Sequence, residues 1–133
     1  MNATAVWRGE ERFEVQSDSG HTVILDGSSA HEAGPSPVEM VLGALCVCTS
    51  VDVVSILKKK REPIEGLTVT ARAERAPDPP RVFTHIHLIY RIRGAVAHKA
   101  ANDAVSLSKN KYCTVSKMLE KAATIDYAIE YES

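Results

Sequence analysis

The segment from Met40 to Leu57 constrains the fold of this chain more than any other. It holds eighteen residues with a single charged side chain, Asp52, and its apolar residues point to nearly every side of a helix. Such a helix must be covered on most of its sides, and one sheet of a chain this small covers only one of them. We therefore expect a second copy of the chain to cover another side, which predicts a homodimer.

The same segment is close to the minimum length of a membrane-spanning helix. Asp52 lies within it together with Thr49, Ser50 and Ser55, and a carboxylate near the middle of a bilayer is costly. The composition, with 44% hydrophobic and 25% charged residues, is that of a globular protein. We therefore expect a helix buried in a soluble protein, with no membrane partner.

The ends of this helix are marked by local signals. Ser36 is a good N-cap, Pro37 suits the first helical position, and Glu39 places a carboxylate at the positive end of the helix dipole. The basic run 58–61 suits the opposite end, and Pro63 stops the helix. The pattern predicts one long helix that begins at Pro37.

The rest of the chain alternates between strand and helix patterns. Strands are predicted in a hairpin over 2–16 that turns at Gly9–Glu10, and at 21–25, 67–74, 82–92 and 125–131. Helices are predicted at 96–109 and 113–122, with a break at 109–112. The predicted architecture is a single α+β domain over 1–133, in the order βββ–α–ββ–αα–β, with antiparallel sheets around the central helix.

Charge and cysteine content narrow the function classes. The net charge of −1 and the pI near 6.5 give no reason to expect a nucleic-acid partner. The first twelve residues carry charges in place of a signal peptide, and the cysteines number three, an odd count. We therefore expect a cytoplasmic protein whose cysteines are either packing residues or reactive thiols.

Two cysteines lie on predicted helices. Cys113 begins a helix, where unpaired N–H groups favour a thiolate, so we expect a polarised thiol there. Cys48 lies in the middle of the long helix, where burial alone would raise its pKa, so an activating cation would have to come from elsewhere in the fold. The alternative for both is a small buried packing residue.

Other candidate ligands carry weaker signals. Cys46 and Cys48 form a C-x-C pair, which on a helix diverges by about 200°, so we expect Cys46 to be a packing residue and predict no metal site. His85 and His87 point the same way on one strand. They could bind metal or line a pocket, but a half-exposed sheet face is the favoured interpretation.

The run from Gly34 to Val54 resembles the signature of the OsmC/Ohr family. In that family a proline opens the central helix and the peroxidatic cysteine follows eleven residues later, which matches Pro37 and Cys48. The second family motif is similar to Cys113-Thr114-Val115-Ser116-Lys117. The order of predicted elements matches the family along essentially the whole chain.

This resemblance implies a thiol-dependent peroxidase. Cys48 would reduce an organic hydroperoxide and become a sulfenic acid, and Cys113 would then form a disulfide with it. A lipoyl or thioredoxin-like dithiol would restore the pair, without a cofactor. The family places the site at the interface of an intertwined homodimer. The implied substrate pocket is lined by Val38, Leu45, Asp52 and Tyr112.

The sequence also departs from the family pattern. Where the Ohr branch has a catalytic glutamate, this chain has Val38, and the acid appears one position later as Glu39. Glu39 is therefore the candidate catalytic acid, and its alternative role is that of a first-turn carboxylate. The partner arginine of the family lies in the N-terminal β region, where Arg8 is preferred over Arg12. These departures leave an alternative open: an OsmC-like dimer with weak or no peroxidase activity that binds an apolar small molecule or acts as a redox-responsive protein.

Overall fold

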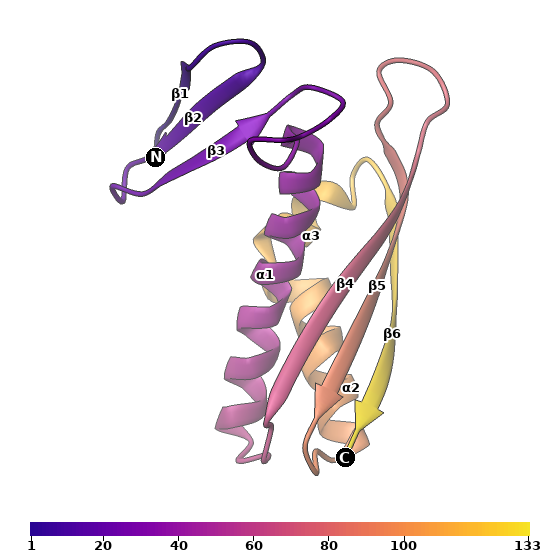
Figure 1. The fold of residues 1–133 in the computed structure, drawn as a ribbon. Coiled ribbons are helices and arrows are strands. Elements are labelled where there is room, and N and C mark those ends of the chain that lie inside the picture. Colours follow the sequence, from indigo (N-terminus) through magenta and orange to yellow (C-terminus); the bar gives the residue numbers. More distant parts are fainter. The chain divides into compact units, whose positions relative to one another are not determined.

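The computed structural model describes all 133 residues. They form two compact units, an N-terminal unit of Met1–Leu42 and a C-terminal unit of Gly43–Ser133. The elements follow in the order β1 (Ala3–Trp7), β2 (Arg12–Ser17), β3 (Thr22–Asp26), α1 (Pro37–Lys59), β4 (Gly66–Arg75), β5 (Phe83–Arg93), α2 (His98–Leu107), η1 (Ser108–Tyr112), α3 (Thr114–Leu119) and β6 (Thr124–Glu132) (Figure 1). The predicted α+β order is confirmed, and the expected break near 109–112 is a π-helical turn, η1.

The N-terminal unit holds a three-stranded antiparallel sheet in the order β1-β2-β3. The predicted hairpin turns at Gly9–Glu10, where Arg8 N–H donates to the carbonyl of Arg12 at 2.9 Å. Both turn residues have positive φ, 106° at Gly9 and 51° at Glu10. Glycine adopts this conformation without strain, which explains the placement of Gly9.

The C-terminal unit holds a second sheet in the order β4-β5-β6. β4 and β5 are antiparallel as predicted, but β6 runs parallel to β5, so the expectation of purely antiparallel sheets was wrong. The reason lies in the connection. A parallel neighbour needs a long crossover, and the segment from β5 to β6 provides one by folding into α2, η1 and α3.

The two faces of this second sheet differ in character. One face is fully buried and carries Ile86, Leu88, Tyr90 and Ile92. The other carries polar side chains, and there His85 and His87 both contact the carboxylate of Asp126. The two histidines are half-buried, which agrees with the favoured interpretation of a half-exposed sheet face.

Within the C-terminal unit, α1 is covered along only one stripe. Leu45, Thr49, Val53 and Leu57 repeat every fourth residue and are buried, as one face of a helix must be. Val47 and Val51 remain 64% and 62% exposed. By length and composition alone α1 could also cross a membrane, a test that core helices of soluble proteins pass as well.

A candidate redox site at Cys48 and Cys113

The structure brings Cys48 and Cys113 together. Cys48 lies on α1 and Cys113 follows η1, and the side chains are close enough that Cys48, after burial, contributes to the raised pKa of Cys113. Both are free thiols; Cys113 is buried and Cys48 is partly exposed. A pair this remote in sequence meets only through the packing of α1 against the crossover. Their catalytic roles stay a prediction.

Cys113 does not have the polarised thiol that its position predicted. Its sulfur accepts a hydrogen bond from the Ser116 amide at 3.4 Å, but it is completely shielded from solvent. Burial raises its pKa from 9.0 to about 12, and the neighbouring Cys48 and Asp52 act in the same direction. The prediction was wrong because α3 is only six residues long and one N–H group does not offset the loss of water.

The turn that carries Cys113 is fixed on both sides. The Cys113 amide donates to the carbonyl of Ser108 at 2.7 Å, which closes η1. The Ser116 hydroxyl donates to the carbonyl of Lys109 at 3.2 Å, and the Lys117 ammonium to that of Asn110 at 3.3 Å. Short π-helical segments are frequent at functional sites. Here the segment sets the position of a thiol.

A buried chain of hydroxyl groups adjoins the two thiols, and the sequence analysis missed it. The Thr49 hydroxyl lies 2.7 Å from both the Tyr90 and the Ser108 hydroxyls. Ser108 in turn donates to the Asp52 carboxylate at 2.9 Å. Burial raises the pKa of Tyr90 to about 12. The sequence feature that could have predicted this chain is the presence of Thr49 and Asp52, two polar residues in an otherwise apolar helix.

Two of the four predicted pocket residues share one groove. Asp52 and Tyr112 both line a groove of about 640 Å³. Its other lining residues are Ser55, Ile56, Lys59, Lys60 and Leu107. Leu45 is completely buried and does not line this groove. Val38 belongs to the N-terminal unit, so these two residues stay predictions.

A second and more apolar groove runs along the exposed side of α1. It measures about 920 Å³ and is lined along α1 by Cys46, Val47, Val51 and Val54, among others, and along β4 by Leu67 and Val69. Burial raises the pKa of Cys46. Cys46 is partly exposed in this groove, and its packing role stays a prediction.

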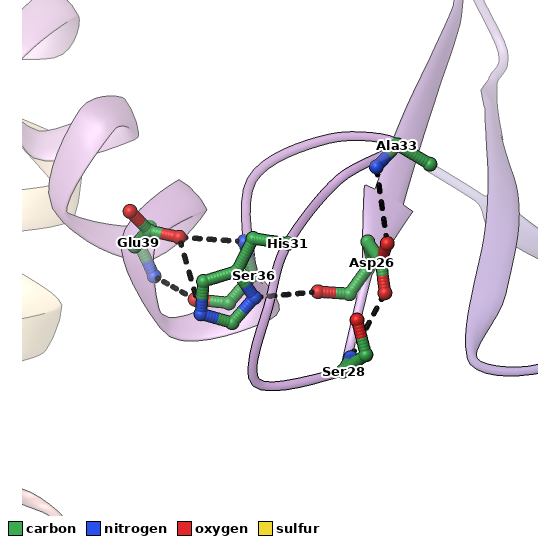
Figure 2. A network of polar contacts seen from close by, with 6 residues as sticks. All are labelled: Asp26, Ser28, His31, Ala33, Ser36 and Glu39. Atoms are coloured by element: carbon green, nitrogen blue, oxygen red, sulfur yellow. Dashed lines mark hydrogen bonds and ion pairs between the residues drawn. The ribbon is translucent and has the colours of Figure 1, made fainter.

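Glu39 caps the start of α1. Its carboxylate accepts from the Ser36 amide at 2.8 Å, and its own amide donates to the Ser36 hydroxyl at 3.1 Å (Figure 2). This reciprocal pair is a capping box. It confirms the predicted N-cap and first-turn carboxylate. The Ser36 hydrogen bonds hold the pKa of Glu39 below its ordinary value. A catalytic role for Glu39 stays a prediction.

The loop before this helix is anchored by Asp26. Its carboxylate accepts from the amides of Ser28 at 2.9 Å and Ala33 at 3.1 Å (Figure 2). Hydrogen bonds from Ser28 are the main cause that lowers the pKa of Asp26 to about 2. His31 then reaches the Glu39 carboxylate at 3.9 Å. The segment that presents Ser36 and Glu39 is therefore held in place by a network of polar contacts.

Arg8, the preferred activating arginine, is paired within the N-terminal unit. Its guanidinium donates twice to one carboxylate oxygen of Glu14, at 2.9 and 2.6 Å. The Arg8 side chain is 53% exposed. An exposed pair of this kind contributes little stability, so Arg8 can exchange partners at low cost. Its role at the site stays a prediction.

The elements and the thiol pair define a small α+β protein with two redox-capable cysteines. The family model described as OsmC-like protein matches residues 29–128. Protein YhfA of Escherichia coli K12 is 44% identical over 131 residues, which cover 98% of this chain and 97% of the relative. The chain belongs to the OsmC-like family, and the predicted resemblance is confirmed.

Solved structures share the fold. A hypothetical protein from Aquifex aeolicus VF5 is 28% identical with a TM-score of 0.85, over 99% of this chain and 97% of that one. The organic hydroperoxide resistance protein OhrB of Bacillus subtilis is 15% identical with a TM-score of 0.71, over 98% of both chains. The second likeness establishes the fold alone.

Proposed function

We propose that this protein is a thiol-dependent peroxidase that reduces organic hydroperoxides in the cytoplasm. The observation that carries the proposal is the contact between Cys48 and Cys113, which places a partly exposed thiol beside a buried, protonated one. Membership of a family that includes organic hydroperoxide resistance proteins supports it. No cofactor is needed, because the two thiols carry both redox electrons.

The proposed chemistry proceeds in two steps. The Cys48 thiolate attacks the terminal peroxide oxygen, the O–O bond breaks, and the alkoxide leaves as an alcohol after taking a proton. Cys48 is then a sulfenic acid. The Cys113 sulfur attacks it, the S–S bond forms, and the hydroxyl leaves as water with the thiol proton. A dithiol, lipoyl or thioredoxin-like, reduces the disulfide and completes the cycle.

The environment of each thiol favours this order. Cys113 is buried and stays protonated at neutral pH because its pKa is about 12, and the thiolate is the nucleophilic form. Cys113 therefore suits the second step, in which its target is already beside it. Cys48 is partly exposed and suits the first step, in which a peroxide must reach the sulfur.

We also propose a homodimer in which a second copy covers the exposed stripe of α1. Val47 and Val51 expose 64% and 62% of their surface, and the apolar groove beside them has β4 as its other wall. Contiguous apolar surface of this kind marks an interaction site. The activating arginine is proposed to be Arg8.

The decisive experiment measures consumption of cumene hydroperoxide with dihydrolipoamide as reductant. We expect wild-type protein to turn over and Cys48→Ser to be inactive. Without added dithiol, Cys113→Ser should consume about one equivalent and stop as the sulfenic acid. Cys46→Ser is the matched control on the same helix and should retain turnover. Normal turnover by Cys48→Ser would refute the proposal.

The second candidate function is a dimer that holds an apolar small molecule. Two observations favour it: Val38 replaces the glutamate of the Ohr branch, and the groove along α1 is large and apolar. A ligand retained in native mass spectra, with ordinary thiol reactivity at Cys48 and no turnover of peroxide, would select this candidate over the peroxidase.

A further inference from the structure

We propose that Asp52 is a positioning residue that acts through Ser108 to place the Cys113 thiol for disulfide formation with Cys48. The inference rests on the proposed function, because disulfide formation is its second step. Its basis is a closed ring of contacts that joins α1 to the π-helical turn η1. No part of that ring belongs to the N-terminal unit.

The ring has four members. Asp52 is one helical turn after Cys48, so both project from one face of α1. The Asp52 carboxylate accepts from the Ser108 hydroxyl at 2.9 Å. The Ser108 carbonyl accepts from the Cys113 amide at 2.7 Å, and the Cys113 side chain returns to Cys48. A shift of Ser108 would therefore move Cys113 relative to Cys48.

The buried hydroxyl chain gives Ser108 a single orientation. An ionised carboxylate only accepts hydrogen bonds, so Ser108 must donate its one hydroxyl proton to Asp52. Thr49 must then donate to Ser108, and Tyr90 to Thr49, over O···O distances of 2.7 Å each. All three residues are completely or almost completely shielded from solvent. The charge of Asp52 therefore orients three hydroxyl groups on three elements.

The same charge acts on the thiol proton. Burial is the main cause of the raised pKa of Cys113, and the charge of Asp52 acts in the same direction, so that sulfur stays protonated until the sulfenic acid is beside it. When the S–S bond forms and the S–O bond breaks, the thiol proton leaves with the hydroxyl group as water. The titratable groups that face Asp52 are Lys59 at the end of α1, Lys60 just after it, and Tyr112 of η1, which line the same groove. Cys113 follows η1, and Tyr90 on β5 is reached through the hydroxyl chain.

Two variants separate the contact from the charge. Asp52→Asn keeps an oxygen that accepts from Ser108 but removes the charge, and Ser108→Ala removes the contact but keeps the charge. Thr70→Ala is the control, because Thr70 is exposed on β4, lines neither groove described above and makes no contact in the ring. The rate of Cys48–Cys113 disulfide formation is measured against pH after a single addition of cumene hydroperoxide, with Cys48 oxidation followed separately by dimedone trapping.

We expect Ser108→Ala to slow disulfide formation about tenfold at every pH, since misplacement of a reacting group costs rate. Asp52→Asn should move the pH midpoint of that step to lower pH. Ser108→Ala should not change dimedone trapping of Cys48, and Thr70→Ala should match wild type in all measurements. Wild-type disulfide rates and an unchanged midpoint in both variants would overturn the proposal. Because the asparagine side chain is nearly isosteric, that arm of the test holds even if Ser108→Ala folds poorly.

A glutathione redox buffer distinguishes failure of this inference from failure of the proposed function. It forms the Cys48–Cys113 disulfide without any peroxide, so the ring is tested even if wild-type protein does not react with cumene hydroperoxide. We expect the equilibrium constant of that disulfide to fall about tenfold in Ser108→Ala, because the thiols lose effective concentration. An unchanged constant would overturn the positioning role.

Discussion

The hydroxyl groups of Thr49 and Tyr90 lie 2.7 Å apart in the core of the C-terminal unit. Thr49 follows Cys48 directly in the chain, so the contact fixes the helix turn that carries a candidate reactive thiol to the central strand of the sheet. We expect loss of this contact to lower the free energy of unfolding more clearly than it lowers the rate of peroxide reduction.

Thr49→Val is therefore expected to destabilise the protein. The change preserves shape but leaves the buried Tyr90 hydroxyl without its partner and removes one contact of Ser108, which keeps Asp52, at a cost of about 1–3 kcal/mol in the free energy of unfolding. Urea denaturation measures it. The double variant with Tyr90→Phe should lose less than the sum of the two single changes, since both partners are then apolar; strict additivity would contradict the contact.

The protonation of Cys113 predicts how stability depends on alkaline pH. Burial raises the folded-state pKa from 9.0 to about 12, so the unfolded chain releases this proton first. The contribution of Cys113 to the free energy of unfolding should therefore be constant below pH 9 and fall as pH rises from about 9 towards 12. Tyr90 adds to the fall through its own raised pKa. Urea titrations across this range should show a shallower fall in Cys113→Ala.

Arg8 and Arg12 are the two candidates for the cation that would activate Cys48, so matched substitutions of them test which one acts. We expect Arg8→Met to lower peroxide consumption at least about tenfold, because the cation would stabilise charge at Cys48, and Arg12→Met to leave it nearly unchanged. Glu14→Gln controls for the ion pair that Arg8 makes. Equal activity of all three variants would remove Arg8 from the site.

The capping box predicts separate effects for its two residues. Ser36→Ala should cost about 0.5–2 kcal/mol in the free energy of unfolding, as loss of an N-cap does. Glu39→Gln retains a side chain that closes the box, so thermal stability should stay close to that of wild type. A fall in turnover with stability unchanged would identify Glu39 as a catalytic residue.

The exposed stripe of α1 predicts the position of the dimer contact. Val51→Glu places a charge on a residue that is 62% exposed in one chain, and burial of an unpaired charge is costly. We expect light scattering to report monomers for this variant. Val82→Glu, at a position 53% exposed outside that groove, should leave the oligomeric state unchanged. A dimer that persists in Val51→Glu would exclude this face.

Local signals were sufficient for most of the elements. Ser36 and Pro37 marked the start of α1 because capping depends on residues within one turn. The direction of β6 was not predictable in the same way, since the alternation of Ile125, Tyr127 and Ile129 is the same in parallel and antiparallel strands. Direction is decided by the length and folding of the crossover, which the alternation does not report.

The candidate site also has features that the sequence predicts and features that depend on the fold. The family pattern identified Cys48 and Cys113 as candidate site residues. The helix dipole predicted a lowered pKa for Cys113, but burial by segments distant in the sequence raises that pKa. The bond from Ser108 to Asp52 spans 56 positions. No residue close to Ser108 or Asp52 in the sequence predicts this hydrogen bond, so only the structure reveals it.

The parallel pairing of β6 with β5 also dictates a sequence of events during synthesis. The third strand joins only after the ribosome has released the whole crossover, and Cys113 lies within that crossover. A nascent chain that stops before Thr124 thus carries both cysteines but lacks the strand that pairs with β5. We therefore expect the sheet of the C-terminal unit to be completed only when the last strand has been translated.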